Sequence, residues 1–330
     1  MEIRNVIIIG GGPAGLSAAL YTARAGLKPL VLAGSPPGGQ LMLTTEVENF
    51  PGYEEIMGPD LIQTLRKQVL KFGTEILDDN VKEIVTSSHP FTIKTHKTEY
   101  STKAVIIATG AQAMWLGLES ETRLRGKGVS ACATCDGFFF KNKIVAVVGG
   151  GDTAMEEAQT LAKFAKKVYL IHRKDSFRAS KIMQVRVREN PKIEIIMNTS
   201  ITKVLGEQKV EGVELVVSHQ PSAVSRLKLD GVFIAIGHKP DTAVFKDTIL
   251  LDKKGYIVTS AVAALDIAKN IPRPDGVMFD YTYQSMTSVP GVFAAGDCVD
   301  HTYRQAGTAA GMGIASALDI ERWIEKKEVI

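Results

Sequence analysis

The strongest constraint on the fold of this chain is a glycine pattern that occurs twice. Residues 6–9 form a short apolar run that stops at Gly10, and the sequence then reads Gly-x-Gly-x-x-Gly before an amphipathic segment. The same design returns after residues 144–148, where the pattern begins at Gly149 and closes with Ala154. A glycine cluster at one strand end is often only a turn, but strand, pattern and helix together form the context of a dinucleotide-binding unit. Two such units predict an α/β protein with two Rossmann-like dinucleotide-binding domains of the three-layer type.

Each glycine of the pattern has its own physical purpose. The first permits a tight turn, the second lets the backbone approach a pyrophosphate, and the third allows the helix to pack closely on the strand. The phosphates would then lie at the positive end of the helix. No Gly-Lys-Ser or Gly-Lys-Thr follows, so a phosphate loop of the ATPase type is excluded. The predicted phosphate-binding residues are Gly10, Gly12, Pro13, Ala14 and Gly15 in the first unit and Gly149, Gly151, Asp152, Thr153 and Ala154 in the second.

The two units differ at the end of their second strand, where ribose recognition is decided. The second unit continues with His172, Arg173 and Lys174, and Arg178 follows closely. Arg and Lys pair with a dianionic phosphate, so this stretch favours NADPH, although an ordinary solvated basic turn has the same composition. The first unit ends its second strand at residues 30–34 with neither an acid nor a base. An acidic residue commonly binds the ribose hydroxyls there, so the ribose contact of the first unit stays open.

The composition agrees with a soluble protein of two domains. The chain has 330 residues, 45% of them hydrophobic and 23% charged, and its net charge is only +3. Domains typically contain about 100 to 200 residues, and so mild a charge gives no reason to expect a nucleic-acid or anionic-membrane partner. No apolar run approaches the roughly 18 residues of a spanning helix, and the first apolar run does not resemble a signal peptide. We therefore expect a cytoplasmic protein that binds neither membrane nor nucleic acid.

Cysteine is scarce in the chain and points to redox chemistry. Two of the three cysteines, Cys132 and Cys135, form one Cys-x-x-Cys motif, and the third is Cys298. A zinc site normally needs four ligands, and no second Cys or His pair with ligand spacing accompanies the motif. In a reducing compartment such a motif indicates a reversible dithiol without metal. For Cys298 we expect a buried packing role.

The dithiol stands in a longer motif, because residues 131–137 read Ala-Cys-Ala-Thr-Cys-Asp-Gly just before the second glycine pattern. With this motif the chain resembles the low-molecular-weight thioredoxin reductases, the class II FAD- and NADPH-dependent pyridine nucleotide-disulfide oxidoreductases. The resemblance covers nearly the whole length, and the shared order of the motifs makes it specific. The other matching segments are 38–41 (GGQL), 48–52 (ENFPG), 108–110 (ATG), 172–178 (HRKDSFR), 235–240 (AIGHKP), 296–297 (GD) and 304–306 (RQA).

The resemblance implies that an NADPH-binding domain is inserted into an FAD-binding domain. It assigns residues 1–113 and 246–330 to the FAD domain and residues 114–245, which carry the Cys-x-x-Cys, to the NADPH domain. In the relatives the smaller domain rotates, so that nicotinamide and disulfide reach the flavin in turn. The matching hinge positions are residues 110–112 and 241–243.

The resemblance also implies further cofactor residues. Gly296 and Asp297 would contact the ribityl or phosphate part of FAD, although Asp297 could instead cap a helix. Glu156 matches a position near the nicotinamide, although an acid in the first turn of a helix also complements the helix dipole. The remaining matched positions are Gly39, Gln40, Asn49, Thr109, Gly110, Ile236, Gly237, Arg304, Gln305 and Ala306.

The chemistry that the resemblance implies is a thioredoxin-disulfide reductase, in which electrons pass from NADPH through FAD and the Cys132–Cys135 disulfide to oxidised thioredoxin. Cys135 would face the flavin, and Cys132 would be the outer thiol that attacks thioredoxin. Asp136 would protonate the departing thiolate, which a carboxyl group does near neutral pH only if burial raises its pKa. The alternative for Asp136 is a simple turn residue before Gly137.

The segments on either side of the dithiol suggest a partner surface. Residues 123–128 form a basic loop, and Phe138, Phe139 and Phe140 follow the dithiol. Aromatic anchors beside cations predict thioredoxin docking near Lys127, Phe138 and Phe139, although at least one of the three phenylalanines should belong to the core. Because the relatives form homodimers, we also expect a homodimer.

Two other functions are compatible with the sequence. One is an NAD(P)H-dependent reductase of a different dithiol carrier, either glutaredoxin-like or peroxiredoxin-linked. The other is a nucleotide-binding redox sensor without turnover. The presence of Cys132, Cys135 and Asp136 together argues against the sensor, which would need no proton donor beside its dithiol.

Overall fold

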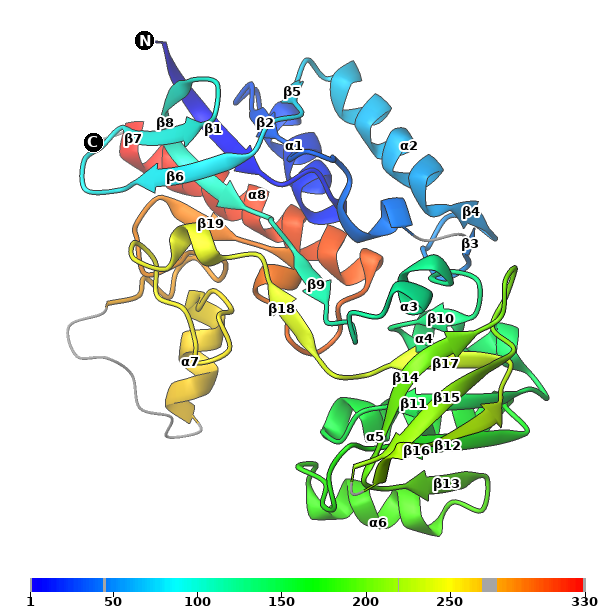
Figure 1. The fold of residues 1–330 in the computed structure, drawn as a ribbon. Coiled ribbons are helices and arrows are strands. Elements are labelled where there is room, and N and C mark those ends of the chain that lie inside the picture. The colour runs from blue at the N-terminus through cyan, green and yellow to red at the C-terminus, as the bar shows by residue number, and fades with distance from the viewer. Residues whose placement is uncertain (1, 44–45, 219, 269–277, 329–330) are drawn as a thin grey trace. The chain divides into compact units, whose positions relative to one another are not determined.

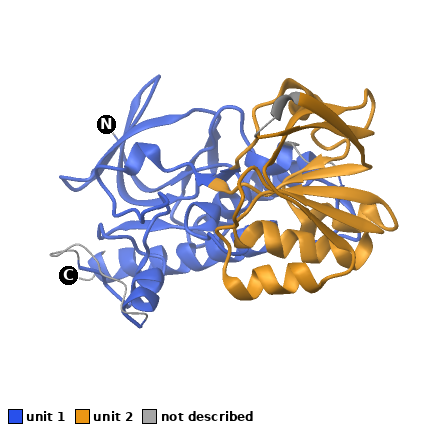
Figure 2. Ribbon diagram, turned by 60° about the horizontal axis from the view of Figure 1, so that its bottom comes forward, with its two compact units in different colours: residues 1–112, 239–330 blue, residues 113–238 orange. Residues whose placement is uncertain are grey.

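The computed structural model describes residues 2–43, 46–218, 220–268 and 278–328 (Figure 1). The chain separates into two units, coloured in Figure 2: unit 1 contains residues 1–112 and 239–330, and unit 2 contains residues 113–238. Each unit has a parallel sheet covered by helices, and each glycine pattern follows a central strand of its sheet. This mixed α/β architecture with two Rossmann-like units confirms the predicted fold class.

The unit 1 sheet is mostly parallel and has β1 near its centre. Its order is β5 (Glu75–Leu77), β2 (Leu30–Leu32), β1 (Ile3–Ile9), β8 (Glu99–Ile107), β7 (Phe91–Thr95) and β6 (Val81–Val85), and β19 (Val292–Ala294) also pairs with β8. β6 and β7 run antiparallel to their neighbours, and the other strands are parallel. A parallel strand covered on both faces needs apolar residues at successive positions, and Val6, Ile7 and Ile8 are all fully buried.

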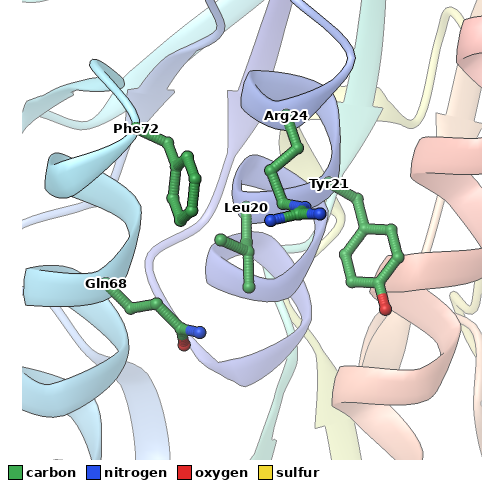
Figure 3. Close-up of a pocket in the computed structure, with 5 residues that line it drawn as sticks. All are labelled: Leu20, Tyr21, Arg24, Gln68 and Phe72. Atoms are coloured by element: carbon green, nitrogen blue, oxygen red, sulfur yellow. The ribbon is translucent and has the colours of Figure 1, made fainter.

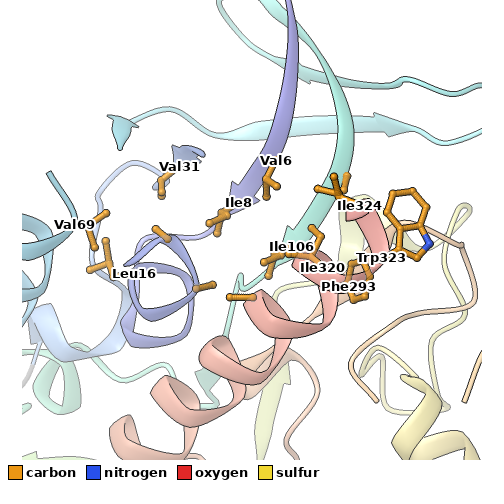
Figure 4. Packing of buried hydrophobic residues seen from close by; sticks show 14 of the residues in the cluster. Val6, Ile8, Leu16, Val31, Val69, Ile106, Phe293, Ile320, Trp323 and Ile324 are labelled. Atoms are coloured by element: carbon orange, nitrogen blue, oxygen red, sulfur yellow. The ribbon is translucent and has the colours of Figure 1, made fainter. Parts of the chain in front are cut away.

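Three helices cover one face of this sheet: α1 (Pro13–Arg24), α2 (Gly58–Lys71) and α8 (Ala306–Glu328). Figure 4 shows Val6 and Ile8 of β1 among Leu16 of α1 and Ile320 of α8. The alternate residues of β1, Ile7 among them, belong to a second core cluster that includes residues of β6 and β7. Side chains of a strand alternate between its two faces, so both cores of unit 1 are specified by one apolar run.

The smaller elements of unit 1 connect these strands and helices. They are η1 (Gly39–Leu43), β3 (Glu46–Val47), β4 (Ile56–Met57), η3 (Ala243–Phe245), α7 (Ser260–Ala268) and η4 (Gly296–Cys298), where η denotes a 3-10 helix. Among the described residues, no helix combines the length and the apolar character that crossing a membrane requires.

Unit 2 repeats the design with a five-stranded parallel sheet. Its order is β10 (Val129–Ser130), β17 (Gly231–Ile234), β11 (Ile144–Val148), β12 (Lys167–Ile171) and β13 (Ile193–Ile196). An antiparallel meander of β14 (Thr199–Leu205), β15 (Gly212–Val217) and β16 (Gln220–Lys228) forms a separate sheet. The helical elements are α3 (Glu119–Arg123), α4 (Ala133–Asp136), η2 (Gly137–Phe140), α5 (Asp152–Phe164) and α6 (Lys181–Glu189).

The chain passes between the units in two short strands, β9 (Ala111–Ala113) and β18 (His238–Pro240), which pair with each other. A glycine in the left-handed region precedes each strand: φ is +75° at Gly110 and +118° at Gly237. Glycine adopts such angles without the steric cost of a Cβ atom. Residues 239–245 lie in unit 1 and Ala113 lies in unit 2, whereas the boundaries expected from the resemblance follow Ala113 and Phe245.

Candidate active site

The first glycine pattern forms the turn between β1 and α1. Gly10 has φ +124°, and a Cβ atom there would overlap the carbonyl oxygen of Ala108. A Cβ atom at Gly15 would likewise overlap the carbonyl oxygen of Gly10, so helix and strand lie as close as the pattern predicts. Beside Gly12 the nearest atom to such a Cβ is the Gly38 carbonyl oxygen at 4.0 Å. Two glycines therefore close the turn, and the middle one leaves room for a group to approach the backbone.

Four segments that are distant in sequence meet at the start of α1. Ala14, Ala108, Ala295 and Ala309 form one buried cluster. Gly296 lies against Ala14, because a Cβ atom at Gly296 would be only 2.8 Å from the Ala14 Cβ atom. The structure thus gathers the first glycine pattern with the segments that contain Thr109, Gly110, Asp297 and Ala306. Small side chains at this junction keep the backbones close together.

Asp297 stands out in this region because of one buried carboxyl oxygen. Among the described residues, buried Oδ1 of Asp297 has no hydrogen-bond partner. Burial, followed by the charge of Asp300, raises the pKa of Asp297 to about 6, and Arg304 opposes the shift. The 3-10 helix η4 has no side-chain cap at its start, so the helix-cap alternative finds no support. A buried carboxyl oxygen without a donor fits a site that receives a hydroxyl group from a ligand.

The segment after Asp297 is held by a carboxylate that the sequence analysis missed. Asp300 accepts hydrogen bonds from the backbone N–H groups of Thr302, Tyr303 and Arg304 at 2.8, 2.9 and 2.9 Å. Arg304 takes the uncommon φ of 50° in this turn. Only the spacing of an acid before a short turn could have signalled this arrangement.

Two further predicted segments lie beside α1 and α8. Asn49 Nδ2 donates to Gln305 Oε1 at 3.3 Å, which brings the ENFPG and RQA segments together at the start of α8. Gly39 and Gln40 begin η1, directly after Gly38, whose carbonyl is the group nearest to Gly12. The positions predicted around the first cofactor thus lie near the N-terminal ends of α1 and α8.

The end of β2 is where the expected ribose acid is missing. Gly34 N–H donates to the Asp79 carbonyl at 3.2 Å, and Ser35 N–H donates to Asn80 Oδ1 at 2.9 Å. Asn80 Nδ2 also donates to the Ser35 carbonyl at 3.4 Å. The polar side chain at this strand end is therefore an amide from the turn after β5. No sequence pattern indicated this amide, because β5 and β2 become neighbours only in the folded sheet.

The second glycine pattern forms the turn between β11 and α5. A Cβ atom at Gly149 would overlap the Ala235 carbonyl oxygen, and one at Gly151 would meet nothing within 4 Å. The Ala235 contact also brings the segment with Ile236 and Gly237 next to the pattern. Asp152 Oδ1 accepts hydrogen bonds from Ser180 N–H at 2.9 Å and from Ser180 Oγ at 2.7 Å. The N-terminal ends of α5 and α6 are thereby tied together, with Thr153 and Ala154 in the first turn of α5.

The basic stretch after β12 divides into one packed residue and three exposed ones. The His172 ring is buried against Gly150 and the Phe177 ring, and a ring nitrogen lies 3.1 Å from the Ser176 carbonyl oxygen. Burial lowers the pKa of His172, and the neighbouring cations lower it further. This ring supports the glycine turn from behind. The three cations of this stretch, Arg173, Lys174 and Arg178, are exposed. Glu156 on α5 is exposed as well.

The dithiol motif lies between β10 and η2 and is oxidised. Cys132 and Cys135 form a disulfide, and the Cys135 N–H donates to Cys132 Sγ at 3.1 Å. Burial raises the pKa of Asp136, and the influence of the Ser130 side chain lowers it in part. A carboxyl group whose pKa is raised by burial can carry a proton at higher pH than an exposed one. The structure therefore supplies the environment that the acid role of Asp136 requires.

The segments predicted to dock thioredoxin are only partly available. Arg123 donates to the carbonyls of Gly206 and Glu207 at 2.9 and 3.1 Å, and the Arg125 guanidinium lies 4.0 Å from the centre of the Trp115 ring. Lys127 is exposed. Both arginines of the loop therefore make contacts within unit 2, and the side chains of Arg123 and Lys127 are exposed.

The three phenylalanines after the dithiol differ in exposure. Phe138 is 58% exposed, and Phe139 is partly buried. Phe140 is buried, with its ring centre 5.1 Å from that of Phe233. The expectation that at least one of them belongs to the core is confirmed by Phe140.

Cys298 and one hollow on unit 1 are not among the predicted site residues. Cys298 is fully buried, as expected, and its Sγ donates to the Ala295 carbonyl at 3.3 Å. A hollow of about 310 Å³ lies between α1 and α2, at the ends opposite the glycine turn, and Figure 3 shows the side chains that line it. The residues are Leu20, Tyr21, Arg24, Gln68 and Phe72.

Comparison with known proteins gives a consistent result. Residues 4–313 match the family model of the pyridine nucleotide-disulphide oxidoreductases. A thioredoxin reductase of Streptomyces coelicolor is 48% identical over 326 residues, which cover 98% of this chain and 94% of the relative. A thioredoxin reductase of Rickettsia conorii is 47% identical over 327 residues, which cover 98% of each chain.

Solved structures agree with these sequence relatives. The thioredoxin reductase from Giardia duodenalis superimposes with a TM-score of 0.87 at 40% identity, covering 98% of this chain and all 100% of the other. The thioredoxin reductase from Streptococcus pyogenes gives a TM-score of 0.86 at 36% identity, covering 98% and 99%.

Proposed function

The chain belongs to the pyridine nucleotide-disulphide oxidoreductase family, and on this premise we propose that it works as a thioredoxin-disulfide reductase that uses NADPH and FAD. The observation that carries the proposal is the Cys132–Cys135 disulfide followed directly by Asp136, a carboxyl group whose pKa is raised by burial. A dithiol and an adjacent proton donor are the groups that reduction of a protein disulfide needs.

Unit 1 offers a site that fits FAD. The open side of Gly12 and the start of α1 meet the needs of a pyrophosphate. The buried Oδ1 of Asp297, which has no hydrogen-bond partner in the part of the chain that the structure describes, meets the needs of a hydroxyl-bearing chain. When bound, FAD supplies a flavin that takes two electrons from NADPH and passes them to a disulfide. The residues that would hold it are Gly10, Gly12, Pro13, Ala14, Gly15, Gly39, Gln40, Asn49, Thr109, Gly110, Gly296, Asp297, Arg304, Gln305 and Ala306.

Unit 2 offers a site that fits NADPH. The joined N-terminal ends of α5 and α6 would receive phosphate groups, and Arg173, Lys174 and Arg178 lie exposed where a 2′-phosphate would be bound. His172 would support the site by packing behind the glycine turn. The residues that would line it are Gly149, Gly151, Asp152, Thr153, Ala154, Glu156, Ile236 and Gly237.

The side chains of the dithiol motif account for the exchange with thioredoxin. The Cys132 thiolate attacks one sulfur of the thioredoxin disulfide, so that a mixed disulfide forms and the other thioredoxin sulfur leaves and takes a proton from Asp136. Cys135 then attacks Cys132 Sγ and releases the reduced thioredoxin, and the enzyme disulfide forms again. The Cys135 N–H that donates to Cys132 Sγ would stabilise the Cys132 thiolate, which favours Cys132 as the attacking sulfur.

The proposal includes the partner surface. Thioredoxin would dock at Lys127 and Phe138, with Phe139 beside them, because an exposed cation and an exposed aromatic ring suit a partner with an acidic rim. A homodimer and a cytoplasmic location also belong to the proposal, by likeness to the relatives and because a working dithiol needs a reducing compartment.

The test is spectroscopic and kinetic. The purified protein should be yellow, should bleach on addition of NADPH, and should recover its colour when oxidised thioredoxin is added. Parallel assays with glutaredoxin-like and peroxiredoxin-linked carriers separate the leading function from the alternative reductase. Bleaching by NADPH without recovery by any oxidised carrier would instead support a redox sensor. Cys132→Ser and Cys135→Ser variants should bind both nucleotides and lose carrier reduction.

A further inference from the structure

Unit 2 exposes an aromatic ring directly beside the dithiol motif. The 3-10 helix η2 begins at Gly137, immediately after α4 ends, and its second residue, Phe138, is 58% exposed. The Phe138 ring packs edge-on against Phe139 and Phe164, with ring centres 6.5 and 6.1 Å away. Phe164 is the last residue of α5, so the exposed ring lies where η2 meets the end of that helix. A large apolar side chain left exposed at such a place suits contact with a partner.

Two lysine-bearing segments lie side by side next to this ring. Lys141 N–H donates to the Phe138 carbonyl at 3.2 Å, so the first segment continues directly from η2. Lys166 N–H donates to the Lys143 carbonyl at 2.8 Å, which joins that segment to the residues after α5. The exposed lysines of the two segments, which we call the lysine patch, are Lys141, Lys143, Lys163 and Lys166. None of them lies in a segment that carries the family resemblance.

The structural needs of this region are met by other lysines. Lys192 Nζ donates to the carbonyls of Ala162 and Ala165 at 2.9 and 3.0 Å, so the C-terminal end of α5 already has its cation. Lys167 pairs with Glu194 at 2.5 Å. In the part of the chain that the structure describes, no member of the lysine patch makes an ion pair. The charges of the patch are therefore left for solvent or for a partner.

The segments that form the lysine patch carry positive charge only. Residues 137–143 and 158–167 contain no acid, although the whole chain has a net charge of only +3. Two acids border the segments: Asp230 accepts from the Ile144 N–H at 2.8 Å, and Glu194 is held in its ion pair. Exposed like charges act together on an approaching molecule over roughly a Debye length, which is about 10 Å at 0.1 M salt. The patch thus presents local positive charge beside an apolar ring.

We propose that the lysine patch and Phe138 form a docking surface that selects an acidic protein carrier, one with carboxylates around its disulfide. This inference rests on the proposed function and adds to it the charge by which the enzyme distinguishes carriers. The Phe138 ring would anchor the carrier, and the lysines would speed encounter with acidic carriers and disfavour basic ones. Phe138 follows Cys135 by three residues, about one turn of 3-10 helix, so a carrier seated on the ring has the enzyme disulfide within reach.

Charge reversal in a salt series tests this surface. Wild type and the double variant Lys163→Glu/Lys166→Glu are assayed as holoproteins with NADPH and oxidised thioredoxin. The uncharged disulfide bis(2-hydroxyethyl) disulfide, which needs no docking, is assayed in parallel. At about 10 mM NaCl the variant should lose about tenfold in kcat/KM for thioredoxin, the lower end of electrostatic steering. At about 500 mM NaCl the loss should be less than about twofold, because salt screens exposed charges. Reduction of the uncharged disulfide should not change.

Three further variants serve as controls. Lys163→Arg/Lys166→Arg keeps both charges and should keep the wild-type rates. Lys253→Glu/Lys254→Glu makes the same change in net charge at an exposed turn of unit 1, and it should change no rate more than about twofold. Phe138→Ala should lower kcat/KM for thioredoxin at both salt concentrations, because salt does not screen an apolar contact.

A binding measurement separates this inference from the proposed function. Fluorescence anisotropy of labelled oxidised thioredoxin, mixed with oxidised enzyme without NADPH, reports docking in the absence of turnover. Thioredoxin that binds wild type more tightly than the Glu variant but is not reduced would contradict the proposed function and support the docking surface. Equal kcat/KM and Kd values for wild type and Lys163→Glu/Lys166→Glu at low salt would overturn the inference. So would an equal loss with the uncharged disulfide, or no binding of thioredoxin to wild type.

Discussion

The two glycine patterns of this chain share the same spacing and have very different surroundings. The first is enclosed by small buried residues from remote segments, among them Ala108, Ala295 and Ala309. Even α8 approaches it so closely that a Cβ atom at Gly313 would overlap the Ala14 carbonyl oxygen. The second pattern is accompanied by exposed cations on the stretch after β12, Arg173 and Arg178 among them.

The shared glycine spacing specifies the same kind of turn in both units, and the neighbouring segments decide how accessible each turn is. A site assembled from distant, buried backbone segments suits a resident cofactor such as FAD. A site rimmed by exposed cations on one connecting loop suits a cosubstrate that must enter and leave, such as NADPH. Substitutions at the enclosed turn of unit 1 and at the exposed stretch of unit 2 should therefore have different effects.

The largest expected effect is on the enclosed turn. Gly10→Ala should lower the free energy of unfolding by about 4 kcal/mol and abolish flavin retention, because the new Cβ meets strain at φ +124° and the Ala108 carbonyl together. The matched control is Gly26→Ala, since Gly26 has φ +76° with nothing within 4 Å of its Cβ position, and it should cost only about 1 kcal/mol. Thermal unfolding and flavin absorbance measure both. Equal costs in the two variants would show that the close approach of the Ala108 carbonyl oxygen to Gly10 does not destabilise the variant.

Asp297 should give the next largest effect, and its sign depends on pH. Its pKa in the folded protein, about 6, lies above the ordinary value of 3.8, so its contribution to stability is full below pH 3.8 and is lost as the pH rises through 6. That shift corresponds to at most about 3 kcal/mol. In flavin-stripped protein, Asp297→Asn should therefore be more stable than wild type at pH 8, and the difference should vanish near pH 4. The same variant should bind FAD more weakly, whereas a helix-cap role would make it less stable at every pH above 4.

The exposed site should respond through the cosubstrate alone. Arg178→Ala should raise the KM for NADPH about tenfold, which is about 1.4 kcal/mol, and change the KM for NADH less than twofold, because NADH lacks the 2′-phosphate. Arg186→Ala, which removes a cation from the body of α6, serves as the control and should change neither. Steady-state assays with both nucleotides decide the matter. An equal rise in both KM values would mean that Arg178 does not read the phosphate.

The elements that the sequence predicted well are those set by local pattern. The run 144–148 became β11 with the same bounds, and the segments that follow the two glycine patterns became the helices α1 and α5. Apolar periodicity and glycine spacing are short-range signals, so these elements needed no knowledge of the rest of the chain. The convergence of the matched segments at α1 could be expected only from family resemblance.

The features that the sequence did not predict depend on contacts between distant residues. Arg123 looked available for a partner, but its acceptors are the carbonyls of Gly206 and Glu207. Asn80 reaches Ser35 because β5 and β2, far apart in sequence, pair in the folded sheet. Charge and propensity do not encode such pairings, which arise from sheet order and turn geometry.

The smallest effects are expected for variants of the loops that follow β2 and β12, where each of the two nucleotide sites has its own polar contact. Asn80 holds the loop after β2 through its hydrogen bonds to Ser35, and Ser218 holds the loop after β12 by donating to the Arg173 carbonyl at 3.1 Å. Asn80→Ala should cost about 1 kcal/mol of stability and weaken FAD binding about threefold, with the KM for NADPH unchanged. Ser218→Ala should do the reverse, raising the KM for NADPH about twofold with FAD binding unchanged.

Flavin titration of the stripped protein and NADPH kinetics measure the two responses in each variant. Because the hydrogen bonds described for each side chain run to its own loop, crossed effects would mean that the two nucleotide sites are coupled. Two separate responses would instead show that each loop is tuned by its own polar contact, even where the first unit lacks the acidic residue that such loops commonly carry.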